Sequence, residues 1–167
     1  MIINHHRNLS KIREKHSKEK IVFCSGSFDL THAGHVLFFE DCRKLGDILV
    51  VGIGGDKIVR INKGYNRPIL NEHARLKIID SLRVVDYCFL DHVSSKTRPL
   101  LSVELVLKKM HPNIYVINED AFNIPYRKSL AKKHGVKLVI LKRRCPPKFK
   151  SISTSNIIKK IRGEALA

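Results

Sequence analysis

A glycine-rich turn between an apolar strand and a helix constrains the fold of this chain more than any other stretch. Residues 21 to 24 form an apolar run that is rich in β-branched side chains and too short for a helix, which predicts a buried strand. From Val36 to Leu45 apolar residues recur at 36, 39, 42 and 45, and Gly46 follows, which predicts a helix that ends at a glycine. The residues between them, GSFDLTHAGH at 26 to 35, therefore join a strand to the start of a helix.

This turn has the features of a phosphate-binding site. A strand-to-helix turn presents unpaired backbone N–H groups and the positive end of the helix dipole to an anion. His32 and His35 are three residues apart, so they share one face of the first helical turn. Two imidazoles beside such a turn indicate chemistry on phosphorus.

Strands and helices alternate along the rest of the chain. Further strands are predicted at 47–53, 86–90, 114–117 and 136–141, and helices at 72–82, 99–110, 124–134 and 157–162, with 57–64 as a basic connection. This order predicts an α/β fold: a single Rossmann-like domain with about five parallel strands and helices on both faces. If the first and fourth strands are neighbours, residues 26–35 and 118–120 flank one crevice. We expect residues 1–19 to be a basic N-terminal extension with a short helix, and 20–167 to be the domain.

Composition and charge narrow the classes of partner. The sequence has neither a membrane-spanning apolar run nor the apolar region of a signal peptide, so a cytoplasmic protein without a membrane partner is expected. Its four cysteines are scattered without a CxxC pair, which argues against a zinc site. The formal net charge of +17 fits an enzyme that acts on polyanionic substrates or a protein that binds nucleic acid.

Three motifs in register resemble those of cytidylyltransferase-like nucleotidyltransferases. They are the HxGH signature, an arginine-bearing helix and a closing IST[ST] motif, found here as Gly26-Ser27-Phe28-Asp29 with His32-Ala33-Gly34-His35, as Arg67-Pro68-Ile69 with Glu72 and Arg75, and as Ile152-Ser153-Thr154-Ser155. The resemblance covers nearly everything from Lys20 to Ile161. The chain is similar to glycerol-3-phosphate cytidylyltransferase and to the nucleotidyltransferase half of bifunctional ADP-heptose synthase, which shares the HAGH form and a KG-x-x-RP loop.

The resemblance implies transfer of CMP or AMP from CTP or ATP to a small phosphorylated acceptor, glycerol phosphate or a sugar phosphate, with release of pyrophosphate. The implied catalytic residues are His32, His35, Lys63 and Arg75. The nucleotide would be bound by the two histidines and by Gly26, Ser27, Phe28, Asp120, Ile152, Ser153, Thr154 and Ser155. The acceptor would be bound by Lys63 and Lys96. Mg²⁺ is expected to accompany the triphosphate, without a metal site built by the protein, and Asp29 is expected to fix the turn or the histidines.

The sequence also departs from the resemblance and leaves alternatives open. Heptose-type enzymes carry Gly-Gly-Asp after the fourth strand, whereas this chain has Asn118-Glu119-Asp120, so the choice of base stays open. Arg75 has an alternative role as a salt-bridge partner of Asp80 or Glu72. An FAD synthetase-like enzyme acting on flavin mononucleotide is a second hypothesis. An RNA-binding protein on the same scaffold is a third, less favoured because only the charge supports it, and nucleic acid is not the expected partner. A homodimer is the default expectation for the oligomeric state.

Overall fold

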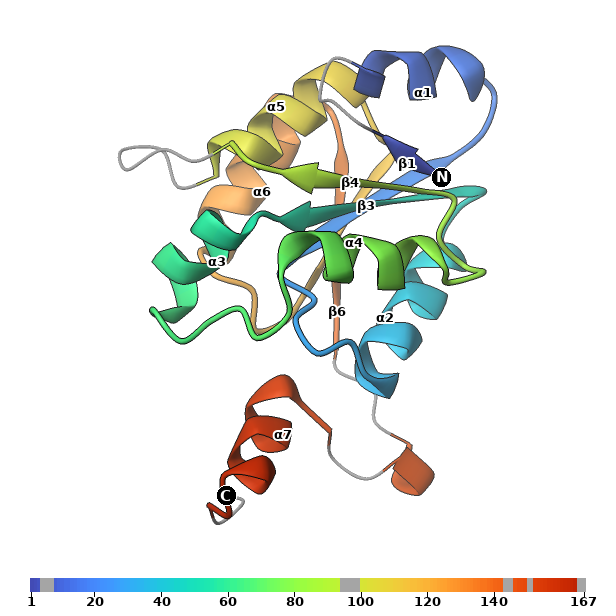
Figure 1. Cartoon of the computed structure of the whole chain (residues 1–167). Coiled ribbons are helices and arrows are strands. Elements are labelled where there is room, and N and C mark those ends of the chain that lie inside the picture. The colour runs from blue at the N-terminus through green and yellow to red at the C-terminus, as the bar shows by residue number, and fades with distance from the viewer. Residues whose placement is uncertain (4–7, 94–99, 143–145, 150–151, 165–167) are drawn as a thin grey trace.

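A parallel sheet runs through the molecule in the computed structural model, which describes residues 1–3, 8–93, 100–142, 146–149 and 152–164 (Figure 1). Six strands make up the sheet in these residues, in the order β1-β4-β3-β2-β5-β6. They are β1 (Ile2–Ile3), β2 (Ile21–Gly26), β3 (Ile48–Gly54), β4 (Tyr87–Asp91), β5 (Ile114–Asn118) and β6 (Lys137–Leu141). Every neighbouring pair is parallel. The predicted Rossmann-like α/β fold is confirmed.

The chain reverses its direction of winding at β2. This strand pairs with β3 on one side, where Gly26 is opposite Ile53, and with β5 on the other, where Cys24 is opposite Val116. The first and fourth predicted strands are therefore neighbours, as expected. In doubly wound sheets ligands bind at the carboxyl ends of the strands at such a reversal. The fold thus directs attention to the residues that follow Gly26 and Asn118.

Helices cover both faces of the sheet (Figure 1). One face carries α1 (Leu9–Lys15), α5 (Leu101–Met110) and α6 (Ile124–Lys133), and the other carries α2 (Ala33–Arg43) and α4 (Glu72–Asp80). Successive residues of a strand point to opposite faces. Accordingly Phe23 packs in the core beneath α1 and α5, whereas Val22 and Cys24 pack in the core beneath α2 and α4. The two cores hold the strand ends in fixed positions.

The described residues ahead of β2 belong to this packed structure. Leu9 and Ile12 of α1 are 0% and 4% exposed, and both are part of the core under α5. The terminal ammonium group of Met1 lies 3.1 Å from the Asp80 carboxylate, and β1 pairs with β4. The helix was expected in this segment, but the two-residue strand was not.

Residues 57–64 were expected to be a connection, and this expectation is wrong. They belong largely to α3 (Asp56–Lys63), which follows Gly55. Asp56 lies in its first turn, where the positive end of the helix dipole stabilises a carboxylate. Only Val59 of this helix is buried. The last helix, α7 (Thr154–Ile161), lies apart from the two helical layers, below the sheet in Figure 1 and after a short 3₁₀ turn at Pro147–Phe149.

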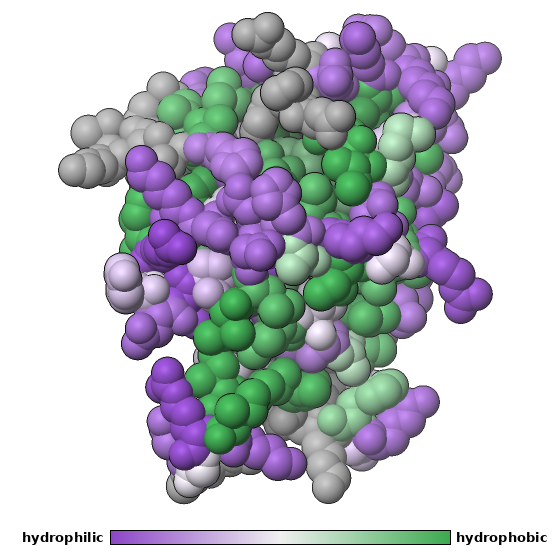
Figure 2. Space-filling model, in the orientation of Figure 1, coloured by the Kyte–Doolittle hydropathy of each residue, from purple (hydrophilic) through white to green (hydrophobic). Residues whose placement is uncertain are grey.

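The surface shown in Figure 2 combines hydrophilic and hydrophobic areas. A hydrophobic area lies in its lower half, where Figure 1 places α7 and the chain just above it. Ile61, Ile69 and Ile161 are among the exposed large apolar side chains. None of the helices in the described residues has the length and apolar character needed to cross a membrane.

Candidate active site

The turn between β2 and α2 is tightly packed by its own residues. Phe28 and Leu30 have positive φ angles of 47° and 48°, a conformation that side chains other than glycine seldom adopt. The Phe28 ring is buried, with its centroid 4.9 Å from that of Phe39 and the edge of His35 packed against it. A Cβ on Gly26 would lie only 2.9 Å from the Phe28 ring, so this position requires glycine. Such strained, over-determined turns cluster at functional sites.

The two histidines are oriented by the start of α2. His32 Nδ1 accepts a hydrogen bond from the Gly34 backbone N–H at 3.1 Å, and His35 Nδ1 accepts one from the His32 backbone N–H at 3.4 Å. The rings are stacked with their centroids 4.0 Å apart. A nitrogen that accepts a hydrogen bond carries no proton, so in each neutral ring the proton is on Nε2. Both imidazoles therefore carry an Nε2–H donor.

Asp29 ties three segments together. Its buried carboxylate accepts hydrogen bonds from the backbone N–H groups of Ile69 (2.8 Å) and Leu70 (2.9 Å) and from Arg67 Nε (2.8 Å). Its backbone carbonyl accepts a bond of 2.8 Å from the Thr154 hydroxyl. Burial alone would raise the pKa of Asp29, but the hydrogen bonds from Leu70, Ile69 and Arg67 outweigh it and lower the pKa. Asp29 is thus an ionised anchor between the turn, the loop at 67–70 and α7.

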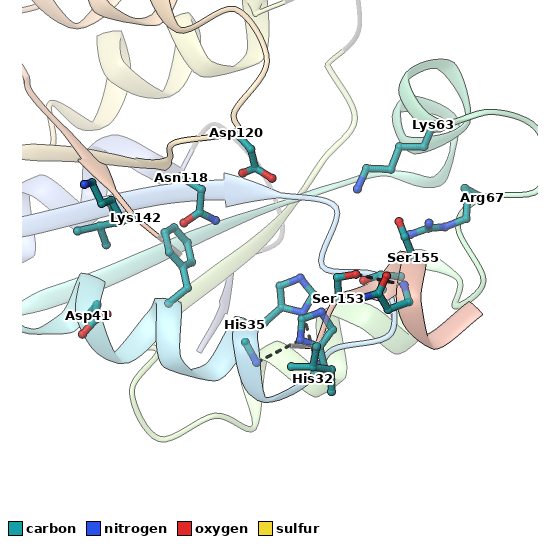
Figure 3. Close-up of a pocket in the computed structure, with 16 residues that line it drawn as sticks. His32, His35, Asp41, Lys63, Arg67, Asn118, Asp120, Lys142, Ser153 and Ser155 are labelled. Carbon is teal, nitrogen blue, oxygen red and sulfur yellow. Dashed lines mark hydrogen bonds between the residues drawn. The ribbon is translucent and has the colours of Figure 1, made fainter. Parts of the chain in front are cut away.

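A cavity of about 870 Å³ opens beside this turn, at the carboxyl ends of β5 and β6 (Figure 3). Of the residues predicted for the site, it brings together His32, His35, Lys63, Asp120, Ile152, Ser153, Thr154 and Ser155. In Figure 3, Lys63, Arg67 and Ser155 lie at one end, Asp41 and Lys142 lie at the other, and the histidines lie between them. The histidines and the start of α7, which are more than a hundred residues apart in the sequence, therefore line the same cavity.

The start of α7 is fixed at this cavity by two hydroxyl groups. Ser153 is the N-cap residue, and its side chain accepts a hydrogen bond from the Asn156 backbone N–H at 3.1 Å. Thr154 donates its hydroxyl to the Asp29 carbonyl. The positive end of the helix dipole is consequently directed at the same cavity as the two histidines. This arrangement suits an anion.

Arg75 requires a correction. It was expected to reach the nucleotide, but its side chain is fully buried and is not among the residues that line the cavity. Its guanidinium donates to the carbonyl oxygens of Ser27 (2.6 Å) and Leu70 (3.0 Å) and to Asp56 Oδ1 (2.8 Å). These bonds fix the backbone of the turn and of the 67–70 loop from the protein interior. Arg75 therefore stabilises the site, and its ion-pair partner is neither Asp80 nor Glu72.

Three further predicted residues, all at the β2–α2 turn, do not line the cavity. Gly26, Ser27 and Phe28 build the turn behind the histidines, and their backbone contact with a nucleotide stays a prediction. Lys96, expected to bind the acceptor, lies outside the described residues. Cys24, Cys42 and Cys88 are buried, as expected of small apolar side chains.

The cavity also contains residues to which the sequence motifs gave no role. Phe38 and Asp41 line it from α2, and Arg67, Asn118 and Lys142 are further lining residues with charged or polar side chains. A signal existed for the first two, because positions 35, 38 and 41 recur with helical spacing and share one face of α2. The position of Arg67 depends on the contact with Asp29, which no local pattern indicates.

Comparison with known proteins identifies the family. A model of cytidylyltransferase-like domains matches residues 23–160. The chain belongs to the cytidylyltransferase-like family. It is accordingly a nucleotidyltransferase, as the motifs at both ends of the domain predicted.

Relatives of this cytidylyltransferase-like chain include the bifunctional protein HldE of Helicobacter pylori strain P12. The two are 34% identical over 155 residues, which are 92% of this chain and 30% of HldE. HldE of Desulfatibacillum aliphaticivorans is 48% identical over 69 residues, 41% of this chain and 14% of that protein. The chain thus spans less than a third of the length of these relatives. They confirm the resemblance to bifunctional ADP-heptose synthase.

Solved structures show the same fold. A lipopolysaccharide core biosynthesis protein from Thermoplasma volcanium is 29% identical with a TM-score of 0.59, covering 77% of this chain and 98% of that one. The pantoate-β-alanine ligase of Francisella tularensis has a TM-score of 0.66 at 19% identity, covering 97% of this chain and 77% of the ligase. The second likeness concerns the fold alone.

Proposed function

We propose that this chain transfers AMP from ATP to the phosphate group of a small sugar phosphate and releases pyrophosphate. The observation that carries this proposal is the single cavity in which His32, His35 and Lys63 meet the start of α7. The relatives named HldE and the lipopolysaccharide core protein support a sugar phosphate as acceptor. CTP with glycerol phosphate is the second candidate pair, favoured by the cytidylyltransferase-like family model.

The proposed step is a direct displacement at phosphorus. An oxygen of the acceptor phosphate forms a bond to the α-phosphorus, the bond from that phosphorus to the oxygen bridging to the β-phosphate breaks, and the electron pair leaves with pyrophosphate. A phosphate dianion is already nucleophilic, so the step requires no general base. Catalysis then consists of positioning and of stabilising the charge that develops on phosphoryl oxygens.

The chain's own groups divide this work along the cavity. The Nε2–H groups of His32 and His35, whose tautomers are set by the helix start, donate to oxygens of the α- and β-phosphates. The N-terminus of α7, capped by Ser153, holds the triphosphate through backbone N–H groups and its dipole. Lys63 neutralises charge on the transferred phosphoryl group or the acceptor. Asn118 and Asp120, at the end of β5, contact the nucleoside.

Magnesium fits this site as an ion that arrives with the triphosphate. The described residues contain no group of three histidine, cysteine, aspartate or glutamate side chains placed to hold a metal ion. The carboxylates of the cavity lining are Asp41 and Asp120. Mg²⁺ is commonly held by one or two carboxylates together with substrate phosphates. When bound, it would neutralise charge on the leaving pyrophosphate.

A substrate panel tests the proposal. The full chain is incubated with ATP or CTP, each paired with heptose and hexose phosphates, glycerol phosphate or flavin mononucleotide, and pyrophosphate release and thermal stability are measured. The expected result is release with ATP and a sugar phosphate, together with a rise in melting temperature with substrate concentration. No release and no nucleotide-dependent stabilisation from any pair would contradict the proposal. Salt-sensitive binding of bulk RNA that survives replacement of both histidines would favour the RNA-binding hypothesis instead.

A further inference from the structure

Arg67 lines the cavity and has no role in the displacement proposed above. It lies on the loop between α3 and α4, and it lines the cavity with a side chain that is only 14% exposed. Figure 3 shows it beside Ser155 at the end of the cavity where Lys63 also lies. A mostly buried arginine at a cavity wall needs partners for its charge and for its five N–H donors.

Asp29 satisfies only one edge of this guanidinium. Arg67 Nε donates to Asp29 Oδ2 at 2.8 Å, while the same carboxylate also accepts two backbone N–H groups from Ile69 and Leu70. Arg67 Nη2 is buried and has no hydrogen-bond partner among the described residues. Buried donors in native proteins are nearly always paired, so an unpaired one calls for an explanation. An anion that arrives with a substrate supplies it.

The chemistry at this end of the cavity selects phosphate as that anion. A guanidinium presents a planar fork of donors that matches two oxygens of one phosphate group. Lys63 adds a second cation, and Ser155 belongs to the first turn of α7, whose dipole favours negative charge. We propose that Arg67, held by Asp29, binds a terminal phosphate group of a substrate. The proposal rests on the nucleotidyl transfer proposed above.

Two sources could supply this phosphate: the acceptor, or the γ-phosphate of the nucleoside triphosphate. Kinetics of Arg67→Gln and Arg67→Lys distinguish them through the KM of each substrate. We expect the KM of one substrate to rise by about tenfold or more in Arg67→Gln, since hydrogen bonds to a charged group are lost. Arg67→Lys, which keeps the charge but loses the fork, should show a smaller rise. The matched control is Arg60→Gln, an exposed arginine on α3 that does not line the cavity.

The direction of the result identifies the ligand. A higher KM for the sugar phosphate assigns Arg67 to the acceptor, and a higher KM for ATP assigns it to the γ-phosphate. If both KM values stay within about twofold of wild type in a folded Arg67→Gln protein, the proposal is overturned. Melting temperatures establish folding, and if Arg67→Gln does not fold, the same comparison is decided with Arg67→Lys.

Calorimetric titration with inorganic phosphate and inorganic pyrophosphate separates this proposal from the proposed function. If wild type turns over no substrate pair, the proposed function fails. Arg67 is then still supported if phosphate or pyrophosphate binds wild type and Arg60→Gln and binds Arg67→Gln about tenfold more weakly. Equal binding to all three proteins, or no binding to wild type, would refute the role of Arg67.

Discussion

His32 serves α2 and the substrate with different atoms of one ring. Its Nδ1 accepts the Gly34 N–H and so caps the helix, and this bond places the proton of the neutral ring on Nε2. Replacement of His32 by alanine would therefore remove both the cap of α2 and the Nε2–H donor to the substrate. A variant that keeps the cap acceptor is needed to separate them.

His32→Asn provides that separation. The asparagine Oδ1 can accept the Gly34 N–H, but the shorter side chain has no donor where Nε2 lies. We expect pyrophosphate release to fall by about 10² or more, because a donor to the developing charge is lost. His32→Ala should lose the same activity and, with the cap, about 1 kcal/mol of stability. The matched control is His73→Asn on the exposed surface of α4, and wild-type turnover by His32→Asn would exclude the assigned donor.

Asp29 makes the stability of the site dependent on pH. Its pKa in the folded chain lies below the ordinary value of 3.8 because Leu70, Ile69 and Arg67 donate to the carboxylate despite its burial. The contribution of Asp29 is therefore fully present above 3.8 and is lost as the pH falls through the lower folded-state pKa. We expect Asp29→Asn to lower the free energy of unfolding near neutral pH by about 1–3 kcal/mol.

Urea unfolding of wild type and Asp29→Asn over a pH series checks this expectation. The difference between the two proteins should be constant from neutral pH down to about pH 5 and should shrink in more acidic solution. Glu14→Gln is the control, because Glu14 is an exposed carboxylate of α1 that does not line the cavity. A difference that grows on acidification would contradict the assigned sign.

At the scale of elements, α7 brings residues from the C-terminal part of the sequence to the cavity. It contributes no fully buried side chain, so its place depends strongly on the hydrogen bond from Thr154 in its first turn to the Asp29 carbonyl of the β2–α2 turn. Helices with little burial are marginal on their own. The position of its N-terminus should therefore be sensitive to single hydroxyl groups.

Thr154→Val tests this dependence. The substitution preserves the shape of the side chain and removes the 2.8 Å hydrogen bond to the Asp29 carbonyl. We expect the KM for the nucleoside triphosphate to rise by about five- to tenfold, with a small change in melting temperature, because the helix dipole is no longer held at the phosphates. The control is Asn123→Ala, which removes the N-cap of α6, a helix whose residues do not line the cavity. An unchanged KM in Thr154→Val would show that packing alone places α7.

The elements differed in how well the sequence predicted them. Long apolar runs such as β3 are buried on both faces of the sheet and could be predicted from the local sequence alone. The α3 helix was missed because it has only eight residues, fewer than the stretch over which helical periodicity is recognised, and because only one of them, Val59, is buried. The site followed the same rule. His32 and His35 could be placed from local spacing, whereas the burial of Arg75 under Ser27 depends on contacts 48 residues apart in the sequence.

At the scale of the molecule, the parallel order and the reversal at β2 could be predicted because chirality and short connections leave few topologies. The role of the charge could not, because a sum of 32 basic and 15 acidic residues does not say where the charges act. The structure places two of the cations, Lys63 and Arg67, at one end of the cavity. A positive field around such a cavity raises the local concentration of anionic substrates.

Salt dependence of the kinetics tests this use of the net charge of +17. Triphosphates and sugar phosphates are anions, so their association should be accelerated at low ionic strength and screened as the Debye length shortens. Between about 20 mM and 200 mM KCl, at constant Mg²⁺, we expect kcat/KM for ATP to fall by about tenfold. The kcat at saturating substrate should change far less, because binding is then complete. A kcat/KM that is independent of salt would mean that the lysines and arginines outside the cavity serve as a solvated surface and contribute nothing to substrate capture.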